Sequence, residues 1–313
     1  MRKLTSLVVG YDFSMGSTVA LDAALALAKL HGATLTLVTA VPGAIDEDTW
    51  QSVRDKHAND LASDAEIHVL EDIEAMVRKS VELRDAEGVS LRFDIVEDDV
   101  SHGVCKAAYQ YEADMIVVGA TGWSGGERAR IGSQTERIIR RSIWPVFVVR
   151  DNMPFPPKRF VVGTDYSDGS KVAIEGTIAL ARDFGASVHV VHCIDESPGG
   201  LSSFFRPQEP SAAGDIILER AERELAEFLA GFTAEGVTLT QEVIFGLAHR
   251  ILPRVLREQD AQLLGLGSVG RSRLVELLVG GNAERIIRDL PASLLICKPD
   301  SFAFDLERGT FLQ

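Results

Sequence analysis

The amino-acid sequence predicts an α/β protein built from two doubly wound units, each a five-stranded parallel sheet flanked by helices. Two observations lead to this fold class. Short apolar stretches alternate along the chain with longer stretches of helical spacing, which is typical of parallel strands covered by helices on both faces. The same order of motifs then occurs a second time, so the 313 residues are expected to form two copies of one unit.

The repeat is visible in two pairs of segments. Residues 7–41, LVVGYDFSMGSTVALDAALALAKLHGATLTLVTAV, align with residues 160–194, FVVGTDYSDGSKVAIEGTIALARDFGASVHVVHCI. Farther along, ADMIVVGATG (113–122) aligns with AQLLGLGSVG (261–270). The segment between the copies carries three prolines, as linkers often do. We therefore expect a first domain over residues 1–150, a linker over 151–158, a second domain over 159–298 and a C-terminal tail over 299–313.

The elements of the first unit follow from local patterns. Residues 7–10 are a short apolar strand. Residues 17–31 carry apolar side chains at helical spacing, and Gly32 is a suitable C-cap. Residues 34–41 form a β-branched strand. Apolar positions at helical spacing then predict one long helix or two within residues 47–86.

The remaining elements repeat the alternation. A strand is expected over residues 90–96 and a short helix over residues 104–111. Residues 115–118 are continuously apolar, which indicates a strand buried on both faces. A helix over 135–141 and a last strand over 146–149 complete the unit.

Charge and hydropathy argue against several partners. The net charge is −14, and each half, divided after residue 150, has 16 basic and 23 acidic residues, or −7. Such an acidic chain is a poor candidate for nonspecific binding to nucleic acid or to an anionic membrane. No run of about 18 apolar residues is present, so we expect no membrane-spanning helix.

Other features point to a protein of the reducing cytoplasm. The N-terminal stretch MRKLTSLVVGYDFS resembles a signal peptide at first, but Asp12 interrupts it early, and a buried strand is the better interpretation. Three scattered cysteines, at positions 105, 193 and 297, favour small core residues over disulfides or a zinc site. The histidines show no metal-ligand spacing, and we take His189 and His192 as structural.

A glycine-rich loop follows the fourth strand, in the stretch GATGWSGGERARIGSQTERII (119–139). In a parallel sheet, ligands bind beyond the carboxyl ends of the strands, where the strand order reverses. Backbone N–H groups of such a loop and of a helix N-terminus bind phosphate oxygens. Arg128 and Arg130 are placed to neutralise phosphate charge, and Asp12 to accept hydrogen bonds from a ribose or an adenine. This chemistry suits a nucleoside triphosphate.

Simpler interpretations stand beside this one. Ser133 and Glu136 fit the S-x-x-E capping box, so Ser133 would then only cap its helix. The glycines would then only turn the chain, and Asp12 would cap the next helix. GLGSVG (265–270) matches G-x-G-x-x-G, but it follows the fourth strand of its unit and not the first, so we treat it as a chance match. No G-x4-G-K-[ST], G-x-S-x-G or H-E-x-x-H motif occurs.

The motifs together resemble a known family. VVGYDFS and VVGTDYS at the first strands, with G-x2-G-x9-G-[ST] after the fourth strand and then TERIIR or AERIIR, make each half resemble a universal stress protein domain. The resemblance covers residues 4–150 and 158–298. It implies the adenine nucleotide α-hydrolase-like fold, with last strands that pair antiparallel between two domains of one chain. Some members of this family bind ATP and others do not.

The resemblance also implies a ligand and the residues that hold it. The ligand is ATP, with or without Mg²⁺. The first half would hold it with Gly10, Tyr11, Asp12, Val41, Gly119, Gly122, Arg130, Gly132, Ser133, Gln134 and Thr135. A weaker second site would comprise Gly163, Thr164, Asp165, Gly267, Gly270, Gly280, Gly281 and Asn282.

The second site is expected to be weaker because Gly281 stands where the motif has Ser or Thr. The loss of one hydrogen bond to a charged group costs about 1.5–3 kcal/mol, or about 10- to 150-fold in affinity.

The predicted function is that of an ATP-binding regulatory protein of the stress response, with its two domains paired and a homodimer left open. No residue is predicted to be catalytic, although slow ATP hydrolysis or autophosphorylation is left open. The alternatives are a nucleotide-free interaction module and an adenylyl-transferring enzyme, which would need S-G-G-x-D-S where the chain has GYDFS (10–14). Residues 194–213 are predicted as a disordered connection or a lid, and the tail as packing on the body.

Overall fold

The computed structural model describes residues 3–41, 69–122, 131–194, 212–267, 286 and 290–299. The strands in this part of the chain are β1 (Ser6–Gly10), β2 (Thr34–Val41), β3 (Ser90–Glu97), β4 (Met115–Gly119), β5 (Val146–Val149), β6 (Arg159–Thr164), β7 (Ser187–Ile194), β8 (Leu239–Phe245), β9 (Leu263–Gly267) and β10 (Ser293–Cys297). The helices are α1 (Met15–His31), α3 (Val69–Glu82), α4 (Val100–Gln110), α5 (Ser133–Arg141), α6 (Asp168–Phe184), α7 (Ala212–Leu229) and α8 (Ala248–Glu258).

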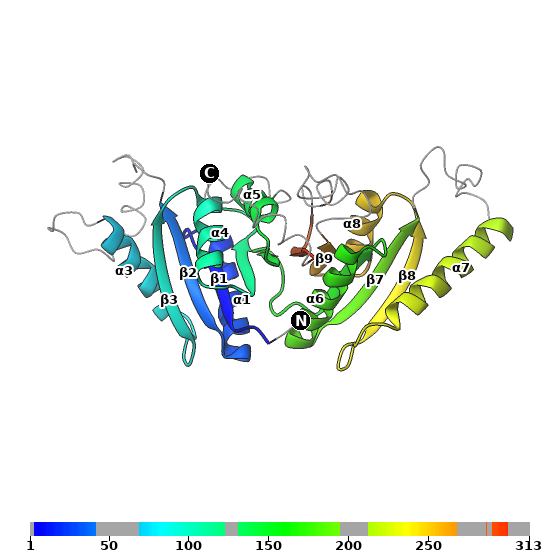
Figure 1. Ribbon diagram of the computed structural model, residues 1–313, viewed down its shortest axis with the longest axis horizontal. Helices are drawn as coiled ribbons and strands as arrows, with labels where there is room; N and C mark the ends of the chain where they lie inside the picture. The colour runs from blue at the N-terminus through cyan, green and yellow to red at the C-terminus, as the bar shows by residue number, and fades with distance from the viewer. Residues whose placement is uncertain are drawn as a thin grey trace.

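The strands form one ten-stranded sheet in the order β3-β2-β1-β4-β5-β10-β9-β6-β7-β8. Within each half all neighbours are parallel, and the order of the first half repeats in the second. Figure 1 shows the first half from blue to green and the second from green to red, with α3 and α7 on the outer sides. The predicted fold class, two parallel α/β units of five strands, is therefore confirmed.

Helices cover both faces of the sheet, and each face has a core that runs through both halves. Alternate residues of a strand face opposite sides, so Leu7 and Val9 lie in one core and Val8 in the other. The first core contains side chains of α1, α3, α6 and α7. The second contains side chains of α4, α5 and α8. Because each core includes residues of both halves, the two units are packed as one body.

Capping explains where the best-predicted helices begin and end. The Ser14 hydroxyl caps α1 by accepting from the N–H of Ser17, and Gly32 ends the helix in the left-handed conformation at φ 66°. α6 has the same pair of caps, Ser167 and Gly185. The repeat in the sequence is thus a repeat of the local signals that start and stop a helix.

The two halves meet at an antiparallel seam. β5 and β10 pair with Leu295 opposite Phe147, which bears out the pairing of last strands that the family resemblance implied. On the first-core side of the sheet, Nε2 of His31 contacts Oδ2 of Asp183 at 2.9 Å, and both side chains are largely buried. His31 ends α1 and Asp183 lies in α6, so this contact links the halves a second time.

Some element boundaries differ from those predicted. α4 begins at Val100 and not at residue 104, because Asp99 caps it. α5 begins at Ser133 and not at residue 135. The described part of the predicted 47–86 helical region is α3, while residues 42–68 lie outside the described residues, as do 195–211 and 300–313 of the predicted loop and tail.

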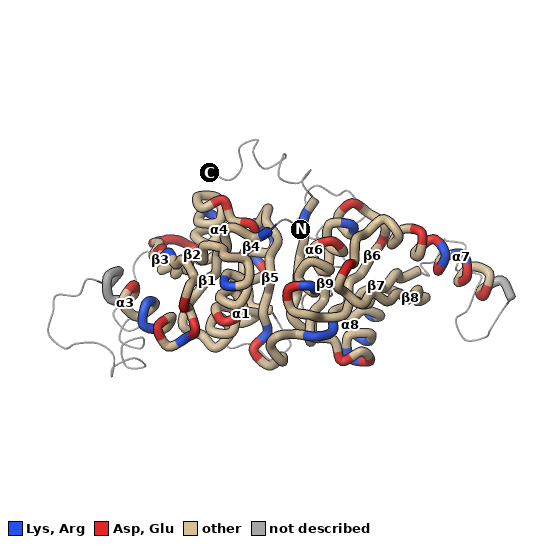
Figure 2. Tube along the Cα trace, turned by 90° about the horizontal axis from the view of Figure 1, so that it is seen from below, with Lys and Arg blue, Asp and Glu red and all other residues tan. Residues whose placement is uncertain are grey.

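Two surface properties bear on partners. Among the described residues, no helix is both long and apolar enough to span a membrane. Figure 2 shows acidic and basic residues interspersed over both halves, without one large field of either sign.

Candidate functional site

A cavity of about 280 Å³ opens at the carboxyl edge of the first half of the sheet. It lies beyond β1 and β4, which are neighbours in the sheet although β2 and β3 come between them in the chain. α1 leaves β1 towards one face and α4 packs on the other, so this is the point where the strand order reverses. The fold thus places the cavity at the position that the sequence predicted for a ligand.

Nine of the eleven residues predicted for the first site line this cavity: Gly10, Tyr11, Asp12, Gly119, Gly122, Gly132, Ser133, Gln134 and Thr135. Arg130 lies outside the described residues, as does Arg128. Val41 lies at the end of β2, but its side chain is buried in the first core. Val38 and Ala40 of the same strand line the cavity, which the sequence analysis did not single out.

Gly119 has a packing role that the sequence interpretation missed. A Cβ on Gly119 would stand 2.3 Å from the carbonyl carbon of Gly16, at the start of α1. In the second half, a Cβ on Gly267 would stand 2.5 Å from the carbonyl carbon of Gly169 in the same way. Both glycines allow the first helix of their half to approach the fourth strand closely, whether or not a ligand is bound.

Gly122 and Asp12 are adjacent in the cavity. A Cβ on Gly122 would lie 2.8 Å from Oδ2 of Asp12, so a side chain there would displace the carboxylate. Oδ1 of Asp12 accepts a hydrogen bond from the N–H of Ser14 at 3.1 Å, across Phe13 at φ 63°. The glycine and the turn together fix where the Asp12 carboxylate lies.

The N-terminus of α5 provides hydrogen-bond donors at the cavity. Its N-cap is Gly132, which has no side chain to cap the first turn, so the predicted capping box at Ser133 is wrong. The first N–H groups of a helix have no acceptor within the helix, and here they belong to Ser133, Gln134 and Thr135, which line the cavity. The exposed hydroxyl of Ser133 lies beside them.

Two predicted donors already have partners within the protein. The N–H of Gly132 donates to the carbonyl of Ala120 at 2.7 Å. The buried Thr135 hydroxyl donates to the carbonyl of Gly119 at 2.8 Å. Both bonds fix the N-terminus of α5 against the loop after β4, so these residues hold the site together.

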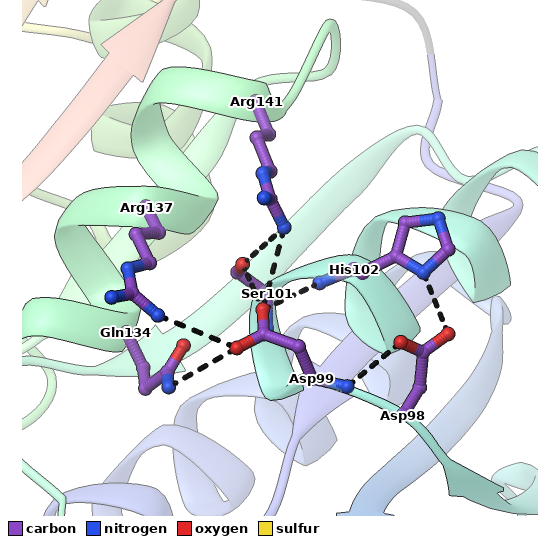
Figure 3. Close-up of polar contacts among 7 residues, drawn as sticks. All are labelled: Asp98, Asp99, Ser101, His102, Gln134, Arg137 and Arg141. Atoms are coloured by element: carbon purple, nitrogen blue, oxygen red, sulfur yellow. Dashed lines mark hydrogen bonds and ion pairs between the residues drawn. The ribbon is translucent and has the colours of Figure 1, made fainter. Parts of the chain in front are cut away.

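A polar network links α4 to α5 beside the cavity (Figure 3). Oδ1 of Asp99 accepts from the N–H of Ser101 at 3.1 Å and from its hydroxyl at 2.5 Å. From α5, Arg137 reaches Oδ2 of Asp99 at 3.4 Å and Arg141 reaches Oδ1 at 3.3 Å. The hydrogen bond from Ser101 is the main reason why the pKa of Asp99 is lowered.

The same network orients the side-chain amide of Gln134. Its Nε2 points to Oδ2 of Asp99 at 3.5 Å, while its buried Oε1 has no hydrogen-bond partner among the described residues. Gln134 is among the residues predicted for the site, whereas Asp99, Arg137 and Arg141 are not. An Asp directly before a helix is a cap signal that could have identified Asp99.

The second half is described only in part around its own loop. Gly163 is the last but one residue of β6, which ends at Thr164. Oδ1 of Asp165 accepts from the N–H of Ser167 at 3.1 Å, as Oδ1 of Asp12 accepts from Ser14 in the first half. The buried hydroxyl of Thr164 contacts Oγ of Ser170 at 3.1 Å. The other predicted residues, Gly270, Gly280, Gly281 and Asn282, lie outside the described residues.

The glycines of GLGSVG have a packing explanation as far as they are described. A Cβ on Gly265 would stand 2.0 Å from Oγ1 of Thr177 on α6, and Gly267 packs on Gly169. These two glycines let α6 approach β9, so their spacing needs no dinucleotide to explain it.

The cysteines and histidines form no reactive or metal site in the described residues. Cys105 and Cys297 are buried, Cys193 is partly buried, and burial raises the pKa of each thiol to about 12. Nδ1 of His192 contacts the carbonyl oxygen of Thr164, and His189 contacts Thr240 and Glu242. No group of three or more His, Cys, Asp or Glu is arranged to hold a metal within the described ranges.

Comparison with known proteins identifies the family. The model of the "Universal stress protein family" matches residues 4–150 and again residues 157–298. This chain belongs to the universal stress protein family. The two matches cover nearly the whole chain, and each contains one of the two parallel units of the sheet.

Relatives include both single and tandem proteins. Universal stress protein Rv2623 of Mycobacterium tuberculosis is 28% identical over 300 residues, which are 90% of this chain and 92% of that protein. Universal stress protein MJ0531 of Methanocaldococcus jannaschii is 28% identical over 45% of this chain and 82% of its own length. The chain spans 62% of the length of universal stress protein Rv2005c of M. tuberculosis, with 27% identity.

A solved structure shares the fold over nearly the whole length of the chain. The structure of PA1789 from Pseudomonas aeruginosa PAO1 has a TM-score of 0.69 and covers 97% of this chain and 96% of that chain at 18% identity. At this identity the likeness concerns the fold alone.

Proposed function

We propose that this universal stress protein is a regulatory protein of the cytoplasm that binds ATP in the cavity of its first half. The observation that carries the proposal is the juxtaposition of donors and acceptors in one cavity of about 280 Å³. The uncapped first turn of α5 offers N–H groups and the positive end of the helix to phosphate oxygens. The Asp12 carboxylate offers oxygen acceptors to hydroxyl or amino groups of a nucleoside.

The residues present fit the ligand in further ways. Gly122 keeps the approach to Asp12 open, since a Cβ there would meet Oδ2 at 2.8 Å. The apolar side chains of Val38, Val100 and Val118 line the same cavity and suit the face of a base. Asp12 is the one carboxylate among the lining residues described, so a bound Mg²⁺ would be held mainly by the phosphates.

A nucleotide-free interaction module is the second candidate, and one observation favours it. Gly119 and Gly267 are explained by the close approach of α1 and α6, which a protein without nucleotide would need as well. Part of the glycine pattern is therefore equally compatible with both functions.

The deciding experiment is calorimetric titration of the full chain with ATP, with and without Mg²⁺, together with chromatography of nucleotide released on denaturation. We expect about one ATP per chain. Ser133→Ala is expected to weaken binding about 10- to 150-fold, because it removes one hydrogen bond to a charged phosphate. Ser90→Ala, an exposed serine at the amino end of β3 and so at the opposite edge of the sheet, is the control and should bind as the wild type does.

The outcomes separate the candidates. No released nucleotide and no heat on titration would refute the proposal and favour the interaction module. Two ATP per chain would show that Gly281 does not impair the second half.

A further inference from the structure

A lysine of the second half binds the C-terminus of a helix of the first half. Lys298 follows β10, and its side chain is only 4% exposed. Its Nζ donates to the carbonyl oxygen of Arg140 at 3.2 Å and to that of Ser142. These carbonyls belong to the C-terminus of α5, whose C-cap is Ser142. The last carbonyls of a helix lack partners within it, and a cation is favourable there.

α5 connects this contact directly to the cavity. The helix has nine residues, and its first three line the cavity. At its N-terminus it is bound to the first half through Gly132 and Thr135. At its C-terminus it is bound to the second half through Lys298. The donors offered to a phosphate therefore belong to a short helix that contacts both halves: the first half also holds its last residue, Arg141, and the second half holds its C-terminal carbonyls through Lys298.

We propose that Lys298 is a positioning residue for the cavity of the first half. By holding the C-terminal carbonyls of α5, the second half fixes the direction in which the first turn of α5 presents its N–H groups. The inference rests on the proposed function and adds that the nucleotide affinity of the first half depends on the second.

Burial lowers the pKa of Lys298 to about 7, and both its ammonium and its amine form carry N–H groups that can donate to the carbonyls of α5. The nearby titratable group on α4 is Cys105, whose pKa burial raises to about 12, so its thiol stays neutral. On α5, the guanidinium of Arg141 is held by Asp99 and Ser101. Lysine is almost never fully buried unless it is paired, and the helix carbonyls supply that pairing.

Arg150 supplies a matched control at the same seam. It follows β5 as Lys298 follows β10, and it is 3% exposed. Its Nε lies 3.5 Å from the carbonyl oxygen of Ala292, and its N–H donates to Oγ of Ser293. Arg150→Met removes a buried cation from the seam, and the two contacts named here are to Ala292 and Ser293, not to α5.

The test compares Lys298→Met with Arg150→Met in the full chain, first without nucleotide. Amide hydrogen exchange in α5 should be faster in Lys298→Met and unchanged in Arg150→Met. Titration with ATP should then show affinity about 2- to 30-fold weaker in Lys298→Met, the usual size of an indirect coupling. Arg150→Met should bind within about twofold of the wild type. Lys298→Arg, which keeps donors and charge, should recover part of the loss.

Each result decides something. Unchanged exchange and affinity in Lys298→Met would overturn the inference, and so would equal losses in the two Met variants, which would indicate general loosening of the seam. If the wild type does not bind ATP, the proposed function fails, and the exchange data alone show whether Lys298 fixes α5. If Lys298→Met does not fold, Lys298→Gln replaces it.

Discussion

At the scale of the residue, glycines of one motif have different physical reasons. Gly119 is required by backbone packing, since a Cβ would stand 2.3 Å from Gly16. At Gly122 an added Cβ would meet only the Oδ2 atom of Asp12, at 2.8 Å, so a larger residue would shift the carboxylate and not the backbone. Gly132 has room, because the nearest atom to an added Cβ is 3.6 Å away, and its φ of −64° suits any residue. A motif of this kind combines constraints of folding with constraints of binding.

Substitution of two of these glycines tests that distinction. Gly119→Ala should lower the free energy of unfolding by about 1–3 kcal/mol, as overpacking does. Gly132→Ala should change it by no more than about 0.5 kcal/mol, as most unstrained substitutions do. Urea denaturation measures both. Equal losses in the two variants would contradict the packing argument for Gly119.

At the scale of the element, the two halves differ at the start of corresponding helices. α4 has Asp99 as N-cap, which accepts from the N–H groups of Ser101 and His102. α8 has Leu247 at the corresponding place, with no side-chain cap. Asp99 also contacts Arg137 and Arg141, so in the first half the cap of α4 is a link to α5. α4, which borders the candidate cavity, thus has more side-chain contacts at its N-terminus than α8, its counterpart in the second half.

Removal of this cap should be measurable. Asp99→Ala should lower the free energy of unfolding by about 1 kcal/mol, the usual value of an N-cap, whereas Asp99→Asn keeps the acceptor and should lose less. The pKa of Asp99 is lower in the folded state than in the unfolded state, so the ionised carboxylate stabilises the fold. This stabilisation is fully present above the pKa of the unfolded state. It is lost as the pH falls through the pKa of the folded state. Urea denaturation at pH 7 and at pH 3 should show a smaller difference between Asp99→Ala and the wild type at pH 3. A difference that does not change with pH would argue against an ionised cap.

At the scale of the whole molecule, the antiparallel pairing of β5 with β10 joins the two five-stranded units into one sheet. It buries Arg150 and Lys298, which follow the paired strands, and His31 and Asp183 meet on the first-core side of the sheet. Burial lowers the pKa of Lys298 to about 7. Lys298 should therefore contribute to the pH dependence of the stability of the chain.

The sign of that dependence follows from linkage. In the unfolded chain Lys298 keeps its proton up to about pH 10.4, but in the folded chain it loses the proton near pH 7. Between these values the unfolded state binds more protons, so Lys298 should make stability rise with pH, by at most about 1.4 kcal/mol per pH unit. Urea denaturation of the wild type and Lys298→Met at pH 6, 7.5 and 9 isolates this group. Parallel curves for the two proteins would contradict the prediction.

The sequence predicted the repeated architecture because its signals are local. β2 was predicted over its observed residues 34–41, since a β-branched run follows Gly32, a left-handed C-cap. The starts of α4 and α5 were predicted too late, because Asp99 and Gly132 define them through cap geometry and not through apolar spacing.

The residues that line the candidate site were largely predicted, but the contacts that hold them in place were not. Nine of its lining residues were predicted from the family resemblance, which the repeat and the glycine spacing carry. The packing of Gly119 on Gly16, the network around Asp99 and the contact from Lys298 join residues far apart in the chain, so no local pattern reveals them.

The pairing of β5 with β10 within one chain affects how amino-acid substitutions can accumulate in the two halves. Two separate chains that met through β5 would form a symmetric dimer, and every substitution would appear in both sites at once. Here the partner is tethered, so the pairing does not depend on protein concentration, and each half can vary alone. Asp99 opposite Leu247, and Ser133 opposite Gly281, are differences that a homodimer could not have. Covalent linkage thus permits one half to specialise in a ligand while the other becomes its scaffold.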